Sequence, residues 1–281
     1  MQQGTAQTRE QEQAEELAVS DSGRSEALPV VRIHDVALHA ISEARCVQWI
    51  VNALDAGHGG WVVTANLDHL RRFSGNNDYT ELCRDATLVV ADGMPLIWAS
   101  KLQGTPLPER VAGSNLISSL SAAAAAQGRS IYLLGGAEGT AKAAAEVLTR
   151  RHSTLRVCGT CCPTISLENG GDSLSVIVEN LSRSKPDIVY VALGSPKQEV
   201  LIDRLRDRFP EIWWLGVGNS FSLLCGHIPR APLWAQRVGL EWLHRLIQEP
   251  RRLWRRYIID GCPFAVRLII GAAWQRLRSA C

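Results

Sequence analysis

The chain has 281 residues, of which 46% are hydrophobic and 21% are charged, and its formal net charge at neutral pH is +2. This length allows one large domain or one domain with an appendage, and the composition excludes a largely disordered chain. A membrane-spanning helix needs ~20 unbroken apolar residues. The nearest stretch, residues 263–274, is short and interrupted by Arg267, so we expect no spanning segment.

The first 28 residues are rich in Gln, Glu and Ser and hold few large apolar side chains. They lack the basic start and apolar run of a secretory signal, so we interpret residues 1–28 as the disordered tail of a cytoplasmic protein. The eight cysteines are then expected to be reduced and mostly buried. Cys158, Cys161 and Cys162 have a spacing suited to a metal, but no second Cys or His pair completes a site, and we expect no bound metal.

From Trp61 onward, short β-branched runs alternate with longer amphipathic segments, a pattern typical of a parallel sheet wrapped by helices. The predicted strands are residues 61–65, 87–91, 130–134, 155–160, 187–193 and 212–217. The predicted helices are residues 67–85, 94–103, 114–127, 138–151, 172–184 and 196–208. The sequence therefore predicts a doubly wound, mainly parallel α/β domain over residues 29–229, whose ligands bind beyond the carboxyl ends of the strands.

Polar or glycine-rich segments follow five of the predicted strands. They are Thr64-Ala65-Asn66, Ala91-Asp92-Gly93 and residues 135–139, 194–199 and 216–221. Each also has a purely structural explanation: Asn66 can cap the next helix, Ser195 with Gln198 fits a capping box, and Asp92-Gly93 can be an ordinary turn. The segment that begins at Gly135 and Gly136 lacks the full spacing of a dinucleotide fingerprint, so it is either a helix N-terminus that approaches a phosphate or plain strand-to-helix packing.

After Ile228-Pro229 the pattern changes to helical segments rich in Trp, Leu and Arg. Residues 230–281 hold ten arginines against two glutamates and one aspartate, a local charge of +7. A basic end on an acidic body indicates an anionic partner, such as a phosphate, a diphosphate, a lipid headgroup or nucleic acid. Pro250 interrupts the first helical pattern and is expected to start a new helix, because proline is accepted in a first turn.

The last segment, residues 258–281, is a basic amphipathic tail. Its characteristic side chains are Phe264, Leu268, Ile269 and Trp274 together with Arg267, Arg276 and Arg278. This composition fits an interfacial segment at a membrane, and it fits equally a helix packed on the body or on a partner, because the two give similar amphipathic patterns.

Five ordered blocks of the sequence, taken together, are similar to one known family. They are Thr64-x-Asn66-x-x-His69, Ala91-Asp92-Gly93, Pro106-x-Pro108-Glu109-Arg110-Val111-x-Gly113-Ser114, Gly194-x-Pro196-Lys197-Gln198-Glu199, and Gly239-Leu240-Glu241-Trp242-Leu243-x-Arg245-Leu246-x-Gln248-Glu249-Pro250-Arg251-Arg252. In these blocks the chain resembles glycosyltransferase family 26, the WecG/TagA/CpsF family, over about residues 31–257. The last block is the most specific, because propensity and packing alone do not dictate so long an ordered string.

The resemblance implies an inverting, metal-independent glycosyltransferase with a Rossmann-like core and a helical appendage, residues 230–257, that completes the active site at the membrane. The implied donor is a UDP-sugar, most typically of N-acetylmannosamine, with its uronic acid or a hexose as alternatives. The implied acceptor is a sugar on undecaprenyl diphosphate, in the biosynthesis of surface polysaccharide or teichoic acid. By the same resemblance Asp92 is the catalytic base, and Thr64, Asn66 and Gln198 are its partners in the pocket.

The resemblance also implies a place in the cell and a set of partners. We expect a peripheral protein on the inner face of the cell membrane, with the anionic membrane surface as a partner. No cofactor is expected, and the chain holds no Asp-x-Asp, the common device by which sugar transferases hold a divalent ion on the donor diphosphate. The oligomeric state stays open, a homo-oligomer included.

Without a metal, the charge of a departing diphosphate must be met by helix N-termini and guanidinium groups. Arg245, Arg252 and Arg255 are spaced by seven and three residues, so on a continuous helix they share one face and are the predicted substrate-binding arginines. The alternative for this run is a solvated basic face.

Two positions depart from the family pattern. Ser222 and Asn115 stand where the family usually has aspartate. Position 222 belongs to the predicted nucleotide-binding region with Gly135, Gly136 and Gly218, so Ser222 bears on the donor contacts.

A noncatalytic α/β protein that docks on anionic membrane through its basic C-terminus is the rival interpretation. Its nucleic-acid version is weaker, because no recognition motif accompanies the arginines, and we expect no nucleic-acid partner. The combination of Thr64, Asn66, Asp92 and Gln198 favours the enzyme, since a binding module has no need of a carboxylate among such residues at a strand end.

Overall fold

The computed structural model describes residues 27–75, 77–163 and 171–280, and the predicted disordered tail lies outside them except for its last two residues. The centre of the molecule is a parallel sheet of six strands in the order β4-β3-β8-β7-β5-β6. The strands are β3 (Gly60–Ala65), β4 (Leu88–Ala91), β5 (Ser130–Gly135), β6 (Arg156–Cys161), β7 (Ile188–Ala192) and β8 (Trp213–Gly216). All six predicted strands are therefore confirmed, each within two residues of its predicted bounds.

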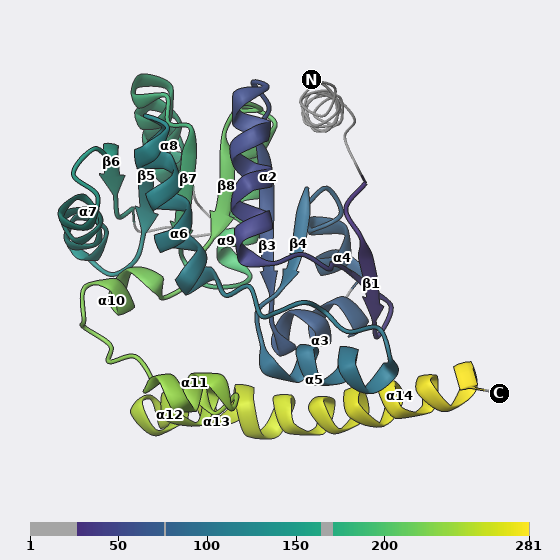
Figure 1. The fold of residues 1–281 in the computed structure, drawn as a ribbon. Helices are drawn as coiled ribbons and strands as arrows, with labels where there is room; N and C mark the ends of the chain where they lie inside the picture. Colours follow the sequence, from purple (N-terminus) through teal and green to yellow (C-terminus); the bar gives the residue numbers. More distant parts are fainter. Residues whose placement is uncertain (1–26, 76, 164–170, 281) are drawn as a thin grey trace, which may run out of the picture.

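Helices cover both faces of this sheet, as a doubly wound fold requires (Figure 1). They are α2 (Glu43–Asp55), α3 (Leu67–Gly75), α4 (Asn77–Leu82), α5 (Met94–Gln103), α6 (Gly113–Ala126), α7 (Thr140–Arg151), α8 (Gly171–Ser184) and α9 (Lys197–Arg206). Two apolar clusters result, one with α2, α6 and α7 and the other with α5, α8 and α9. Successive strand residues alternate between them, since Val63 belongs to one cluster and Val62 to the other.

The sequence did not predict the segment that precedes the sheet. It forms a two-stranded antiparallel hairpin, β1 (Val30–Ile33) and β2 (Val36–His39), followed by α2. The hairpin is joined to the sheet through the ring of His39, which accepts a hydrogen bond of 3.0 Å from the backbone N–H of Val89. The hairpin precedes the alternation of strand and helix patterns that marks the six sheet strands, and only one residue of each of its strands is buried, so the sequence gives little signal here.

The described C-terminal part consists of helices joined by short turns and loops. Its elements are α10 (Ser220–Leu224), α11 (Leu233–Arg237), α12 (Glu241–Gln248), α13 (Pro250–Trp254), the π-helical turn η1 (Arg255–Gly261) and α14 (Cys262–Ala280). A helix begins at Pro250, as predicted. From Pro250 the helix runs on through η1 into α14.

By length and composition the continuous helix Pro250–Arg278 could cross a membrane, contrary to the expectation that Arg267 rules out any such segment. One face of α14 nevertheless belongs to the protein core, because Phe264, Leu268 and Ala272 are buried in the same cluster as Leu96 and Ile97 of α5. The opposite face is open to solvent, since Val266, Ile270 and Trp274 are each more than half exposed. The helix therefore lies along the body and offers a second apolar face outward.

Candidate active site

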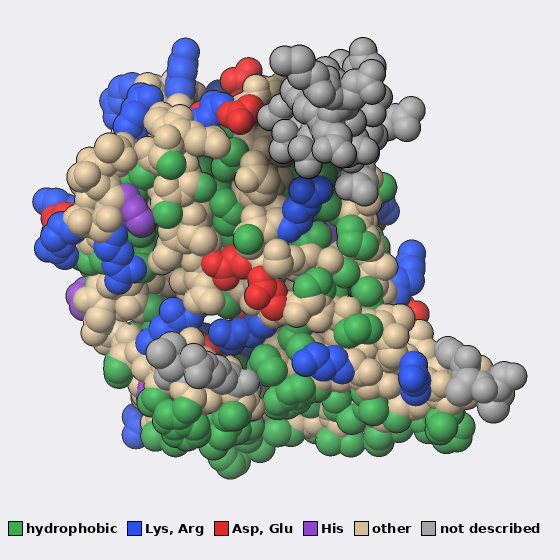
Figure 2. Space-filling view, in the orientation of Figure 1, with side chains coloured by type: hydrophobic (Ala, Val, Ile, Leu, Met, Phe, Trp, Pro, Cys, Tyr) green, Lys and Arg blue, Asp and Glu red, His purple; other side chains and the backbone are tan. Residues whose placement is uncertain are grey.

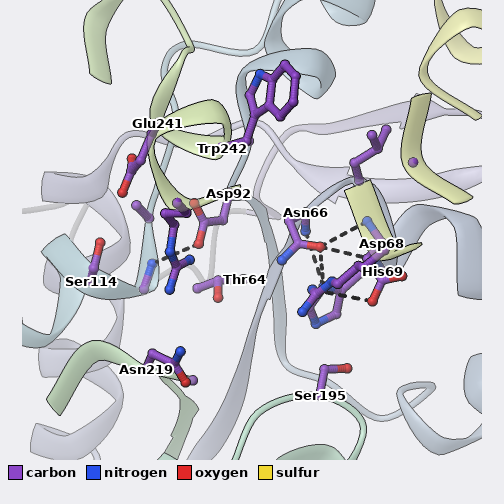
Figure 3. A pocket seen from close by; sticks show the side chains of 18 of the residues that line it. Thr64, Asn66, Asp68, His69, Asp92, Ser114, Ser195, Asn219, Glu241 and Trp242 are labelled. Carbon is purple, nitrogen blue, oxygen red and sulfur yellow. Dashed lines mark hydrogen bonds and ion pairs between the residues drawn. The ribbon is translucent and has the colours of Figure 1, made fainter. Parts of the chain in front are cut away.

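A cavity of about 540 Å³ lies at the carboxyl ends of β3, β4, β7 and β8, and the C-terminal helices form its opposite wall (Figure 3). This size is within the range of small-molecule sites, and the position is the one expected for ligands of a doubly wound sheet. Of the predicted site residues, the cavity brings together Thr64, Asn66, Asp92, Gln198, Gly218, Arg245 and Arg252. Residues from opposite ends of the sequence thus meet around one space.

Asp92 follows β4 directly, so its carboxylate stands at the edge of the sheet. Its Oδ2 accepts a hydrogen bond of 3.3 Å from the backbone N–H of Gly113, at the start of α6. Burial is the largest influence on this group and raises the pKa of Asp92 above its ordinary value, although the Arg110 guanidinium and the Gly113 bond oppose the effect. A carboxylate with a raised pKa is a stronger base than an exposed one, which suits proton abstraction.

Arg110 and Glu241 join the core to the C-terminal wall beside Asp92. A guanidinium nitrogen of Arg110 donates to Glu241 Oε2 at 2.8 Å, and both side chains are only 16% exposed. Both residues line the cavity. Arg110 therefore faces two carboxylates, one from each half of the site.

Thr64 and Asn66 lie at the end of β3, next to β4 and Asp92. Gly113 packs against Thr64, because a Cβ added at Gly113 would lie 3.2 Å from Thr64 Oγ1. Asn66 caps α3, since its Oδ1 accepts from the backbone N–H groups of Asp68 at 3.0 Å and His69 at 3.3 Å. Asn66 thus has both the structural role and the place in the cavity that the sequence predicts.

Gln198 lies at the start of α9, after β7, and both the nitrogen and the oxygen of its side-chain amide form hydrogen bonds. Its Nε2 donates to Glu199 Oε1 at 2.9 Å, and its Oε1 accepts from the backbone N–H of Gly218 at 3.0 Å. Gly216 makes room for this side chain, because a Cβ there would lie 2.4 Å from Gln198 Nε2. Ser195 and Gln198 do not form the capping box considered from the sequence, since the Ser195 hydroxyl instead lies 3.1 Å from that of Tyr79.

Four arginines besides Arg110 line the cavity. Arg71, Arg245, Arg252 and Arg256 line the cavity, whereas Arg255 is exposed and is not among the lining residues. The Nε–H groups of Arg71, Arg245 and Arg256 are buried and make no hydrogen bond to any residue that the structure describes. Groups of this kind are suited to bind the oxygens of an anionic ligand.

Asp68 organises part of this arginine group. Its carboxylate is 8% exposed and pairs with Arg71 at 3.0 Å, Arg72 at 3.2 Å and Arg256 at 3.3 Å. Burial would raise the pKa of Asp68, but the three arginines outweigh burial and hold the pKa below its ordinary value. Arg256 belongs to η1, so Asp68 also ties the C-terminal helices to α3.

Gly135, Gly136 and Ser222 lie outside the set of residues that line the cavity. The two glycines have positive φ, and a Cβ at Gly136 would lie 2.3 Å from Thr140 Oγ1, which is the strand-to-helix packing considered from the sequence. Asn115 does not line the cavity either; Arg230 donates to its side-chain oxygen. Of the predicted nucleotide-binding region, only Gly218 reaches the cavity.

Further residues shape the site and were not predicted to belong to it, among them Arg110, Glu199, Glu241 and Arg256. Three of these four stand inside the blocks Pro106–Ser114, 194–199 and 239–252, so the sequence carried a signal for them in the blocks themselves. Arg256 had no such signal. Among the described residues, no three His, Cys, Asp or Glu side chains lie close enough together to hold a metal ion.

Comparison with known proteins assigns the family. The family model described as Glycosyl transferase WecG/TagA/CpsF family matches residues 31–279, which includes every residue of the cavity. The chain belongs to the WecG/TagA/CpsF glycosyltransferase family.

Two curated relatives carry the same name, N-acetylglucosaminyldiphosphoundecaprenol N-acetyl-beta-D-mannosaminyltransferase. The chain is 31% identical to the protein of Bacillus spizizenii and 27% identical to that of Bacillus subtilis, each over 205 residues. In both cases the match covers 73% of this chain and 77% of the relative. As a member of the WecG/TagA/CpsF family this protein is a glycosyltransferase, and the cavity around Asp92 is its candidate active site.

Proposed function

We propose that this protein transfers a sugar, in the first instance N-acetylmannosamine, from a UDP-sugar to a sugar carried on undecaprenyl diphosphate, with inversion at the transferred carbon. A uronic acid or hexose donor is the alternative within the same reaction. The observation that carries the proposal is the half-buried carboxylate of Asp92, set in a cavity that five arginines line. The names of the relatives support the acceptor and the sugar, and the proposed setting is the biosynthesis of surface polysaccharide or teichoic acid.

Asp92 acts as the general base. As the acceptor hydroxyl oxygen attacks the anomeric carbon, its proton passes to the Asp92 carboxylate and the bond from that carbon to the diphosphate oxygen breaks. A single displacement of this kind inverts the configuration of the carbon. General-base catalysis contributes ~10² to 10⁴ in rate, and burial strengthens the base.

The leaving diphosphate takes the electron pair of the broken bond and needs compensation for its charge. Arg110, Arg245 and Arg252 line the same cavity as Asp92 and can donate paired hydrogen bonds to phosphate oxygens. The Nε–H of Arg245 supports this role, because it is buried and makes no hydrogen bond to a described residue. We therefore propose that guanidinium groups rather than a divalent metal stabilise the leaving group.

The outer face of the C-terminal helices supports docking on a membrane, where a polyprenyl acceptor would reside. Figure 2 shows hydrophobic side chains gathered along the lower edge of the molecule, over α11 to α14, with arginines and lysines above them. The exposed apolar residues of these helices are Trp234, Val238, Leu243, Ile247, Trp254, Ile259, Val266, Ile270, Trp274 and Leu277. Apolar burial together with attraction to anionic lipid would hold the protein on the membrane surface, with the cavity directly above.

The experiment is an incubation of the purified protein with a panel of UDP-sugars and a short-chain lipid-diphosphate N-acetylglucosamine, with and without EDTA. One donor is expected to give a product heavier by one sugar residue, with inverted configuration and with turnover maintained in EDTA. A loss of turnover in EDTA that Mg²⁺ restores would overturn the role of the arginines. No transfer from any donor of the panel would favour a noncatalytic binding protein.

A further inference from the structure

One buried carboxylate at the edge of the cavity takes no part in the proposed reaction. Glu199, the third residue of α9, is 2% exposed and does not line the cavity. Its Oε1 accepts from Gln198 Nε2 at 2.9 Å and lies 3.4 Å from His69 Nε2. Burial would raise the pKa of Glu199, but His69 and Gln198 outweigh burial and hold the pKa below its ordinary value. The group is therefore an anion inside the protein.

His69 connects this anion to Asn66. The ring is 4% exposed, and its Nδ1 lies 2.9 Å from Asn66 Oδ1. Neither neighbouring oxygen can donate a hydrogen, because one belongs to an ionised carboxylate and the other to an amide carbonyl. The ring of His69 therefore bridges the two oxygens. The backbone N–H of Asn66 also lies 3.4 Å from Nδ1.

The network decides which way the Asn66 amide points. Its Oδ1 accepts from two backbone N–H groups, which can only donate, so the oxygen must face α3. The amide nitrogen then faces the opposite way, and Figure 3 shows it on the side of Thr64 and Asp92, away from His69. Asn66 thus presents two N–H donors to the place where the sugars would meet the base.

Gln198 is fixed by the same carboxylate from the other side. With Nε2 held by Glu199 and Oε1 held by the Gly218 backbone, its amide keeps one N–H and one lone pair for a ligand. Asn66 follows β3, Gln198 follows β7 and Gly218 follows β8, and these three strands are neighbours in the sheet. A single carboxylate therefore links the polar ends of three adjacent strands.

We propose that Glu199 is a positioning residue for the transfer reaction: acting directly on Gln198, and through His69 on Asn66, it fixes the two cavity amides that hold the reacting sugars against Asp92. The inference rests on the proposed function. A buried charge lowers stability unless it is compensated, and Glu199 Oε2 makes no hydrogen bond to a described residue. An apolar side chain of similar size would satisfy packing alone, so the retained charge indicates that the amides must be held in one orientation.

Substitution at two positions tests the chain of contacts kinetically. Glu199→Gln keeps the shape and removes the charge, and kcat/KM is expected to fall by about 10- to 100-fold, mostly in kcat, because misplaced groups cost about that much. His69→Asn keeps a donor near the place of Nδ1, whereas His69→Gln keeps one near Nε2. His69→Asn should therefore retain more activity than His69→Gln, and adding Glu199→Gln to His69→Gln should cause little further loss.

Ser121→Ala is the matched control. It removes another fully buried side-chain hydrogen bond, of 3.0 Å to Tyr190, at a position that does not line the cavity. It should lower thermal stability and leave kcat and KM unchanged. Losses in Ser121→Ala equal to those in Glu199→Gln, additive losses in the double variant, or unchanged kinetics in Glu199→Gln would each overturn the proposal.

A measurement without substrate separates this inference from the proposed function. The side-chain amide resonances of Asn66 and Gln198 in ¹H–¹⁵N NMR spectra should move in Glu199→Gln and stay in place in Ser121→Ala. Unchanged amide resonances in Glu199→Gln would overturn the positioning role, whatever the activity. An inactive native protein whose amide resonances respond to Glu199→Gln in this way would instead contradict the proposed function and leave the hydrogen-bond network in place.

Discussion

Asp92 and Arg110 show how individual residues set the chemistry of the site. Asp92 is placed by the end of β4, and burial makes it a stronger base than a solvated aspartate. Arg110 limits that effect, while Glu241 draws the guanidinium toward the C-terminal wall. The balance of these charges decides over which pH range the base is ionised.

The pH dependence of turnover follows from that balance. The base works only when ionised, so kcat/KM should fall as the pH is lowered through the pKa of Asp92. Because burial raises this pKa, the fall should begin at a higher pH than it would for an ordinary aspartate, whose pKa is about 3.9. A rate profile from pH 4 to 9 measures it. A profile flat down to pH 4 would contradict a raised pKa.

The ion pair of Arg110 with Glu241 should contribute measurably to stability. Both side chains are largely buried, so Glu241→Gln should lower the free energy of unfolding by about 1 to 3 kcal/mol. Glu81→Gln breaks the exposed pair with Arg84 and serves as the control, with an expected effect near zero. Equal effects in urea unfolding would mean that the Arg110 pair does not fasten the C-terminal helices.

The elements of the core could be predicted because strand and helix patterns alternate clearly from Trp61 to Arg208. The short strands of the hairpin gave no comparable pattern. The arginine face was predicted for one continuous helix, but the chain breaks at Glu249, where φ is −128° and ψ is 58°, and continues through the π-helical turn η1. The break and the π-helical turn both change which residues share one face of the helix, so Arg256 rather than Arg255 lines the cavity. Local spacing could not have revealed this.

The candidate site was predictable to the extent that its residues follow strands. Thr64, Asn66 and Asp92 each stand at or just after a strand end, and Gln198 is the second residue of the helix that follows β7. The fold brings these positions together. Glu241 and Arg256 come from the C-terminal helices, and their partners Arg110 and Asp68 are more than 100 residues away in the sequence. Contacts of that kind depend on how the helices dock, which no single-sequence pattern specifies.

The two faces of α14 should respond differently to the same substitution. Leu268 is 2% exposed and packs in the core with α5, so Leu268→Ala should lower the free energy of unfolding by about 2 to 5 kcal/mol. Ile270 is 52% exposed, and Ile270→Ala should leave stability nearly unchanged. Chemical denaturation of both variants measures the difference. Equal effects would mean that α14 is not docked on α5 in solution.

At the scale of the whole molecule, the cavity and the exposed apolar face belong to the same group of helices. Gly239 allows this arrangement, because its φ is 77° and a Cβ there would lie 2.7 Å from Met94 and Trp98 of α5. Removal of residues 230–281 would uncover the apolar side of α5, so it would disturb the core as well as any membrane contact. Point substitutions on the outer face of the C-terminal helices therefore test membrane docking better than truncation does.

Membrane docking should depend on both the apolar face and the basic charge. The double variant Trp234→Ser/Trp274→Ser removes two rings that are 63% and 61% exposed, and it should bind anionic vesicles more weakly than the native protein. Val176→Ser, at a position on α8 that is 49% exposed, is the control and should bind normally. Binding should also weaken in high salt. Flotation of the native protein and both variants with vesicles measures the binding. Equal binding by all three would mean that the membrane contact lies elsewhere on the protein.

The most direct test of the account is the turnover of Asp92→Asn beside that of the native protein, with the UDP-sugar that the native protein prefers. The amide keeps the shape of the side chain and cannot take a proton, so turnover should fall by at least ~10²-fold while the circular dichroism spectrum stays the same. Normal turnover in a correctly folded Asp92→Asn protein would contradict the assignment of Asp92 as the base and leave it as a residue of the turn after β4.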